Sequence, residues 1–133
     1  MEAIERVYQC LNEFHAYNIA TCTEGKPHVR VFGTALLYEG KLYIQSGKRK
    51  AFYREGLENP HVELCAWRGP EWMRLSGELV EDDRREVKVA MLEKAPELRG
   101  MYDPDDGNML MLYFKDATAT FNSFTAPTET VTF

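Results

Sequence analysis

Lys41-Leu42-Tyr43-Ile44-Gln45 is a strand-like run that leads directly into Ser46-Gly47-Lys48-Arg49-Lys50-Ala51. A helical stretch from Ala51 to Glu58 follows, and Asn59-Pro60 ends it. Three cations therefore stand at a strand-to-helix corner. A helix N-terminus exposes unpaired N–H groups and carries partial positive charge, so this corner is suited to an anion. Lysine and arginine side chains beside it favour a phosphate group.

Short apolar and β-branched runs, separated by turn residues, extend on both sides of this corner. We predict strands at residues 18–22, 28–38, 42–46, 62–67, 72–80, 109–114 and 117–124, and helices at 2–15, 51–58 and 83–95. Asp82-Asp83 with Glu86 resembles a capping box at the start of the third helix. The tail, residues 125–133, has no clear partner.

These elements favour a mainly β fold. Most connections are short hairpins, which join antiparallel neighbours. About seven antiparallel strands must close or split to bury their apolar faces, so we expect a small β-barrel with three flanking helices packed across its openings. The chain has 133 residues, of which 44% are hydrophobic and 28% charged, and residues 1–133 are therefore expected to form a single globular domain.

Composition narrows the classes of function. The formal net charge of −5 argues against broad nucleic-acid binding. No run approaches the roughly 20 apolar residues that cross a bilayer, and the start lacks a signal peptide, so no membrane partner is expected. Cys10, Cys22 and Cys65 are odd in number and widely spaced, which indicates reduced thiols in a cytoplasm. No histidine pair has metal-ligand spacing, and no metal site is expected.

Alternation along two strands predicts a mixed aromatic and cationic outer surface. Val29 and Val31 share a face suited to the barrel interior, whereas Arg30 and Phe32 share the opposite face. Trp72 and Arg74 alternate in the same way farther along the chain. Aromatic rings beside guanidinium groups suit a flat, conjugated, phosphorylated ligand. The alternative, a solvated basic loop with two surface arginines, fits the periodicity equally well.

Several segments, taken in order, resemble the pyridoxamine 5'-phosphate oxidase-like split-barrel proteins. They are Ala20-Thr21 with Gly25-Lys26-Pro27-His28-Val29-Arg30-Val31-Phe32, then Leu42–Ser46 with Arg49-Lys50-Ala51, then Asn59–Leu64, and then Arg74-Leu75-Ser76-Gly77. The resemblance covers about Ile4 to Phe124. It implies an FMN-binding split β-barrel that forms a homodimer, with the flavin in a groove at the subunit interface.

The resemblance also implies which residues bind the cofactor. They are Arg30, Val31, Phe32, Gln45, Ser46, Lys48, Arg49, Lys50 and Arg74. Arg30 and Lys50 would hold the FMN phosphate with help from Arg49 and Ser46. The backbone at Val31 and Phe32 would face the isoalloxazine edge, and Gln45 would lie near the ring or the phosphate. No catalytic side chain is identified.

The function that the resemblance implies is that of a small flavoprotein. No arginine follows Arg99, unlike the oxidase itself, which carries a C-terminal arginine segment, so the chain looks more like the short, nitroimidazole-reductase-like branch. That branch implies a cytoplasmic FMN-dependent oxidoreductase of a small molecule, with NAD(P)H as a transient electron donor. The alternative is a non-catalytic flavin- or haem-binding module for sensing or storage.

Overall fold

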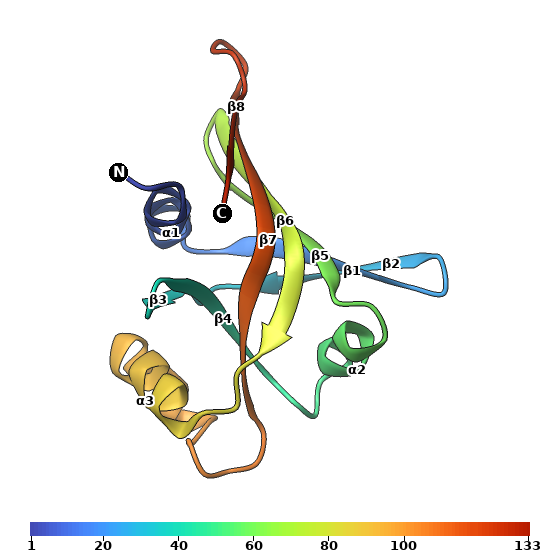
Figure 1. Cartoon of the computed structure of the whole chain (residues 1–133), viewed down its shortest axis with the longest axis vertical. Helices are drawn as coiled ribbons and strands as arrows, with labels where there is room; N and C mark the ends of the chain where they lie inside the picture. Colours follow the sequence, from blue (N-terminus) through green and yellow to red (C-terminus); the bar gives the residue numbers. More distant parts are fainter.

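The computed structural model describes all 133 residues and shows one antiparallel sheet with helices around it (Figure 1). The strand order is β2-β1-β5-β6-β7-β4-β3, and β8 pairs with β7. β2 and β3 stand at the two ends of this path and do not pair with each other, so the barrel is split rather than closed. The mainly β, split-barrel prediction is confirmed, with eight strands in place of about seven.

The elements follow one another with short connections. The strands are β1 (Tyr17–Thr23), β2 (Lys26–Phe32), β3 (Leu36–Tyr38), β4 (Lys41–Gly47), β5 (His61–Arg68), β6 (Glu71–Glu81), β7 (Met109–Ser123) and β8 (Glu129–Thr132). The helices are α1 (Ala3–Phe14), α2 (Ala51–Glu58), α3 (Arg85–Lys94) and a single 3-10 segment, Pro96–Gly100. No helix is long and apolar enough to span a membrane.

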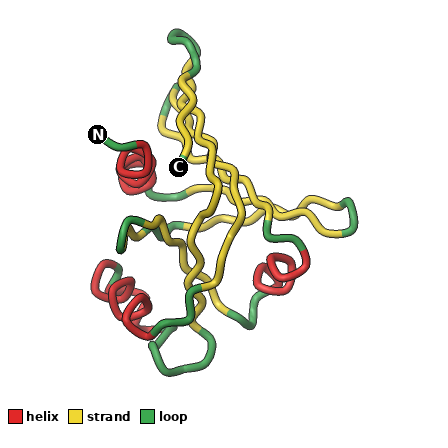
Figure 2. The backbone as a smooth tube through the Cα atoms, viewed as in Figure 1, coloured by secondary structure: helices red, strands yellow, loops and turns green.

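Two apolar clusters fill the molecule. The larger lies within the barrel, where the inward residues of the long strands pack against Phe52 of α2 and against Val7 and Leu11 of α1. The smaller one joins Tyr43 of β4 and methionines of β7 to Met91 of α3. β4 is therefore buried on both faces. Figure 2 shows the helices arranged around the strands at the periphery of the molecule.

The chain departs from the prediction at its C-terminus. The tail was expected to lack a partner, but β8 pairs antiparallel with β7, and Phe133 exchanges two backbone hydrogen bonds with Ala117 at 2.8 and 3.0 Å. Arg6 of α1 reinforces the pairing through an ion pair with Glu129 at 2.7 Å. The alternation in this short segment is too brief to indicate a strand without its neighbour.

Two other strand boundaries were wrong. The predicted strand 28–38 breaks at Gly33-Thr34-Ala35, and its halves, β2 and β3, lie at opposite ends of the sheet. The predicted strands 109–114 and 117–124 are one strand, β7, with a bulge opposite Gly77. Asp116 adopts a φ of 52° at this bulge, so the polar residues that looked like a break are a local kink.

The capping-box prediction for α3 was also wrong. The N-cap is Arg84, and it forms no side-chain cap. Asp82 instead accepts a hydrogen bond from the Tyr43 hydroxyl at 2.7 Å and pairs with the Arg84 guanidinium at 2.9 Å. The carboxylate is used to join β4 to the start of α3 rather than to satisfy the first N–H groups of that helix.

The two faces of β2 are the reverse of the prediction. Val29 and Val31, which were expected in the barrel interior, are 64% and 70% exposed. Arg30 and Phe32 face α2, where the Phe32 ring lies 4.9 Å from the Phe52 ring. β2 is the end strand, and a helix covers its other face, so the inward side chains are those that contact the helix.

Candidate functional site

The strand-to-helix corner lies where the sequence placed it. α2 begins at Ala51, as predicted, and β4 ends at Gly47, one residue beyond the predicted end at Ser46. Asn108, in the segment before β7, holds the backbone between them: its carbonyl accepts the Lys48 N–H at 2.7 Å and its side-chain Oδ1 accepts the Arg49 N–H at 3.0 Å. The corner is therefore supported by a loop that is distant in sequence.

Two kinds of hydrogen-bond donor in the segment around this corner have no side-chain acceptor. Ser46 is 2% exposed, and its hydroxyl has no hydrogen-bond partner. The N-cap of α2, Lys50, forms no side-chain cap, so the first N–H groups of the helix also lack a side-chain acceptor. Buried polar groups in folded proteins are almost always paired. Hydroxyl groups and uncapped helix N–H groups are both suited to donate to the oxygens of an anion.

The three cations at the corner are not equivalent. Arg49 and Lys50 are exposed, and their side chains form no ion pair. Lys48 lies 3.2 Å from Glu81 and 3.5 Å from Asp83, and hydrogen bonding to Glu81 raises the pKa of Lys48. The charge of Lys48 is thus partly neutralised by its own chain, whereas two cations remain available to a ligand.

Arg30 reaches the same helix from β2. Its Nη1 donates to the Thr21 hydroxyl at 2.9 Å, and its Nη2 donates to Glu55 Oε1 at 2.6 Å. The Thr21 hydroxyl donates to the same Glu55 oxygen, and this hydrogen bond, with that from Arg30, lowers the pKa of Glu55. The Arg30 guanidinium lies 5.2 Å from the centroid of the Phe52 ring, so its charge sits against the first turn of α2.

The remaining predicted site residues lie on other faces. Val31 points away from α2 and is exposed. Gln45 is buried on the face of β4 opposite Ser46, and its side-chain amide donates to the Ser46 carbonyl at 2.6 Å. Arg74 lies on the outer face of β6, where it donates twice to Glu63, at 2.6 and 2.9 Å. Only Phe32 joins Arg30 beside α2.

Sequence reasoning missed the residues that support this arrangement. Glu55 lies one turn beyond Phe52 in α2, a helical spacing that places both on one side of the helix and was a usable signal. Thr21 and Asn108 come from β1 and from a distant loop, and no local pattern connects them to the corner.

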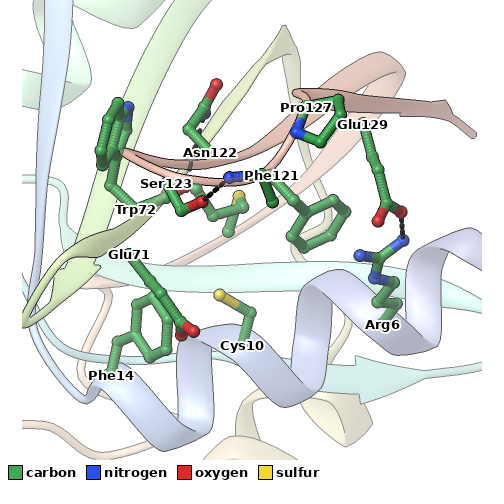
Figure 3. Close-up of a pocket in the computed structure, with 12 residues that line it drawn as sticks. Arg6, Cys10, Phe14, Glu71, Trp72, Phe121, Asn122, Ser123, Pro127 and Glu129 are labelled. Atoms are coloured by element: carbon green, nitrogen blue, oxygen red, sulfur yellow. Dashed lines mark hydrogen bonds and ion pairs between the residues drawn. The ribbon is translucent and has the colours of Figure 1, made fainter.

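A separate pocket of about 240 Å³ lies on another part of the molecule, between α1 and the strands β6 and β7. Figure 3 shows Cys10 and Phe14 of α1 on one side and Trp72 and Phe121 on the other. Burial raises the pKa of the Cys10 thiol to about 11, so this cysteine is protonated near neutral pH. None of the predicted site residues lines this pocket.

Known structures share this architecture along almost the whole chain. A NimC/NimA family protein from Clostridium acetobutylicum is 40% identical, with a TM-score of 0.94 over 97% of this chain and 91% of the other. An FMN-binding protein related to pyridoxamine 5'-phosphate oxidase, from Nostoc punctiforme, is 15% identical, with a TM-score of 0.63 over 98% and 94%. A heme-binding protein from Mycobacterium smegmatis is 14% identical, with a TM-score of 0.69 over 92% and 57%. The last two likenesses show the fold alone.

Comparison with models of protein families and with curated protein sequences found no match.

Proposed function

Because the chain belongs to the NimC/NimA family, we propose that it binds FMN and acts as a flavin-dependent oxidoreductase on a small molecule. The observation that carries this proposal is the buried Ser46 hydroxyl without a partner, near the end of the strand that leads into the uncapped N-terminus of α2. An FMN-binding protein with the same fold supports flavin as the class of ligand.

The phosphate of FMN fits the corner chemically. A phosphate monoester carries a charge between about −1.5 and −2 near neutral pH and presents three acceptor oxygens. Ser46 and the first N–H groups of α2 would donate to these oxygens, and the exposed Arg49 and Lys50 would balance the charge. The bound flavin supplies the redox chemistry, while the chain binds and orients it.

A second copy of the chain is part of the proposal. A groove on one small barrel buries too little of a flavin ring system, so we expect the ring to lie between two subunits. The exposed Val29 and Val31 lie on the face of β2 opposite Arg30 and form an apolar strip that a second copy would cover. Free cysteines are compatible with the reducing cytoplasm that we expect.

Flavin is favoured over haem by the positions of the histidines. His15 and His61 are exposed, and His61 lies 3.6 Å from Glu78 at the start of β5, whereas His28 is only partly exposed on β2. None is buried in a cavity where an axial ligand of haem would be held.

The test is FMN binding followed by reduction. The purified protein, stripped of any ligand, is titrated with FMN and followed by quenching of flavin fluorescence, and the complex is then mixed anaerobically with NADH or NADPH. Saturable binding and bleaching of the flavin absorbance support an oxidoreductase. Binding without bleaching by either nucleotide points to a non-catalytic flavin module. A protein that takes up no FMN contradicts the proposal.

A further inference from the structure

The Arg30 guanidinium has some N–H groups that are hydrogen-bonded within the chain and others that have no acceptor. A guanidinium has five N–H groups, and two of these donate to Thr21 and Glu55. The other three have no partner in the chain, although the side chain is only 24% exposed. Arg30 is therefore fixed in position while it keeps donors for a further acceptor.

A carboxylate beside a phosphate-binding arginine can act in two opposite ways. It can compete with the phosphate for the guanidinium, or it can orient the guanidinium for the phosphate. A competitor would engage the arginine through both of its oxygens in a forked pair. Here only Oε1 of Glu55 is used, and it is shared with the Thr21 hydroxyl. This geometry favours orientation over competition.

The places of Glu55, Thr21 and Arg30 in the fold also favour a role for Glu55 in orienting the guanidinium. Glu55 is in α2 itself, and Thr21, which is 2% exposed, is in the neighbouring strand β1. The three side chains thus tie β1, β2 and α2 together. They place the guanidinium against Phe52, the second residue of the helix whose N-terminus is the proposed phosphate site.

We propose that Glu55 is a positioning residue for the phosphate of the ligand: together with Thr21, it holds Arg30 so that the unused N–H groups of the guanidinium face the N-terminus of α2. The inference rests on the proposed function and adds to it a residue that touches no ligand. It predicts that loss of the Glu55 hydrogen bond weakens phosphate binding, even though a negative charge is removed from beside the site.

The experiment compares FMN with riboflavin, which lacks the phosphate. Glu55→Ala is expected to raise the Kd for FMN about tenfold and to leave the Kd for riboflavin unchanged. Glu55→Gln keeps an acceptor for Arg30 and removes the charge, so its Kd for FMN is expected to stay within about threefold of the wild type. Glu129→Ala, which breaks an Arg–Glu pair between α1 and β8, is the matched control and is expected to change neither Kd.

Each other outcome overturns the inference. Tighter or unchanged FMN binding in Glu55→Ala would mean that Glu55 competes with the phosphate or has no role. An equal loss of FMN and riboflavin affinity would mean that Glu55 only stabilises the fold. Where Glu55→Ala does not fold, Thr21→Val decides in its place, with the same expected loss for FMN and none for riboflavin.

A second readout separates this inference from the proposed function. The ¹⁵N–¹H signal of Arg30 Nε is followed by NMR during titration with inorganic phosphate. A shift in the wild type and in Glu55→Gln, but a weaker one in Glu55→Ala, supports the positioning role even where the wild type fails to bind FMN. A signal that phosphate does not move in the wild type contradicts it. Failure to bind FMN alone refutes only the flavin proposal.

Discussion

Ser46 carries a hydroxyl that the folded chain leaves without a hydrogen-bond partner. Burial of an unsatisfied polar group costs about 1–3 kcal/mol, so such a group in a folded protein calls for a partner such as a water, an ion or a ligand. Thr21, in β1, is as deeply buried, yet its hydroxyl is paired with both Arg30 and Glu55. The contrast between these two hydroxyls assigns a structural role to Thr21 and leaves the Ser46 hydroxyl for the ligand in the proposed function.

Ser46→Ala should therefore have opposite effects on stability and on binding. The free energy of unfolding of the ligand-free protein is expected to rise by about 1 kcal/mol, because the buried hydroxyl no longer lacks a partner. The Kd for FMN is expected to rise, since a donor to the phosphate is lost. Urea denaturation and flavin titration measure the two quantities. Thr21→Ala is the contrasting variant, for which we expect a loss of stability.

Arg30→Ala combined with Lys50→Ala should weaken FMN binding sharply. Each lost charge-assisted contact is expected to cost about 1.5–3 kcal/mol of binding free energy. The matched control is Lys26→Ala with Arg54→Ala. It also removes one lysine and one arginine charge, but from exposed residues that form no ion pair. Unchanged flavin affinity in the first double variant, or an equal loss in both, would count against the assigned residues.

At the scale of the elements, close approach of β6 to β7 depends on Gly77. A Cβ at this position would lie 3.1 Å from the Lys115 carbonyl oxygen and 3.3 Å from the Ala117 Cα. Both are backbone atoms next to the bulge of β7 and cannot move independently of the strand. A Cβ at Gly56, in α2, would meet nothing within 4 Å.

Substitution by alanine should therefore lower the stability of the protein at Gly77 and raise it at Gly56. Gly77→Ala is expected to destabilise the protein by about 1–3 kcal/mol, because the strands must separate. Gly56→Ala is expected to stabilise it by about 0.5–1 kcal/mol, because alanine loses less entropy in a helix. Chemical denaturation of both variants measures the difference. Equal effects would show that the close contact between the strands is relieved at little cost.

The junction of β4, β6 and α3 depends on Asp82, which is 9% exposed on its side chain. The Arg84 guanidinium and the Tyr43 hydroxyl hold the pKa of Asp82 well below its usual range. A group with a lowered pKa in the folded state contributes stability that is complete above its unfolded pKa of about 3.9 and is lost as the pH falls below that value.

Asp82→Ala should therefore show a pH-dependent cost. At pH 7 the variant is expected to be about 2 kcal/mol less stable, because the buried Tyr43 hydroxyl and Arg84 lose their acceptor. The difference from the wild type should shrink as the pH falls below about 4. Urea midpoints measured between pH 7 and pH 3 test this. A difference that stays constant over this range would show that the charge of Asp82 contributes nothing.

The local periodicity of apolar residues was sufficient to predict the helices and strands that are long or bounded by strong turn residues. The helix Ala51–Glu58 was predicted to the residue, because Asn59-Pro60 ends it and the Ser46–Lys50 corner precedes it. Periodicity could not decide the faces of β2, because Val29 and Val31 look like core residues until α2 is placed on the other side. It also could not identify β8, whose partner is distant in sequence.

In the candidate site, too, the sequence predicted what is local and missed what depends on tertiary contacts. Ser46, Arg49 and Lys50 are neighbours in sequence, and their local pattern is enough to indicate an anion site. Arg30 was expected at the phosphate by resemblance, whereas its hydrogen bonds to Glu55 and Thr21 depend on three elements meeting in space. The pairing of Lys48 with Glu81 is also a consequence of tertiary structure that a basic run in the sequence does not reveal.

For the molecule as a whole, the split in the barrel leaves β2 as an end strand with an exposed apolar face. An unpaired end strand that presents Val29 and Val31 to solvent is a surface that proteins usually cover. The same strand carries Arg30 on its inner face. A second subunit seated on the exposed face of β2 would lie across this one strand from Arg30, and we expect the flavin ring to lie between the two subunits.

The protein should accordingly be a dimer in solution. Light scattering is expected to give twice the 15.4 kDa mass of the chain. Val31→Asp is expected to shift the protein toward the monomer and to weaken FMN binding together with dimerisation, because the charge would be buried at the interface. Met101→Asp is the control: Met101 is 69% exposed, close to the 70% of Val31, but lies beyond the 3-10 segment rather than on β2. A wild-type monomer that binds FMN tightly would show that one barrel is sufficient for the site.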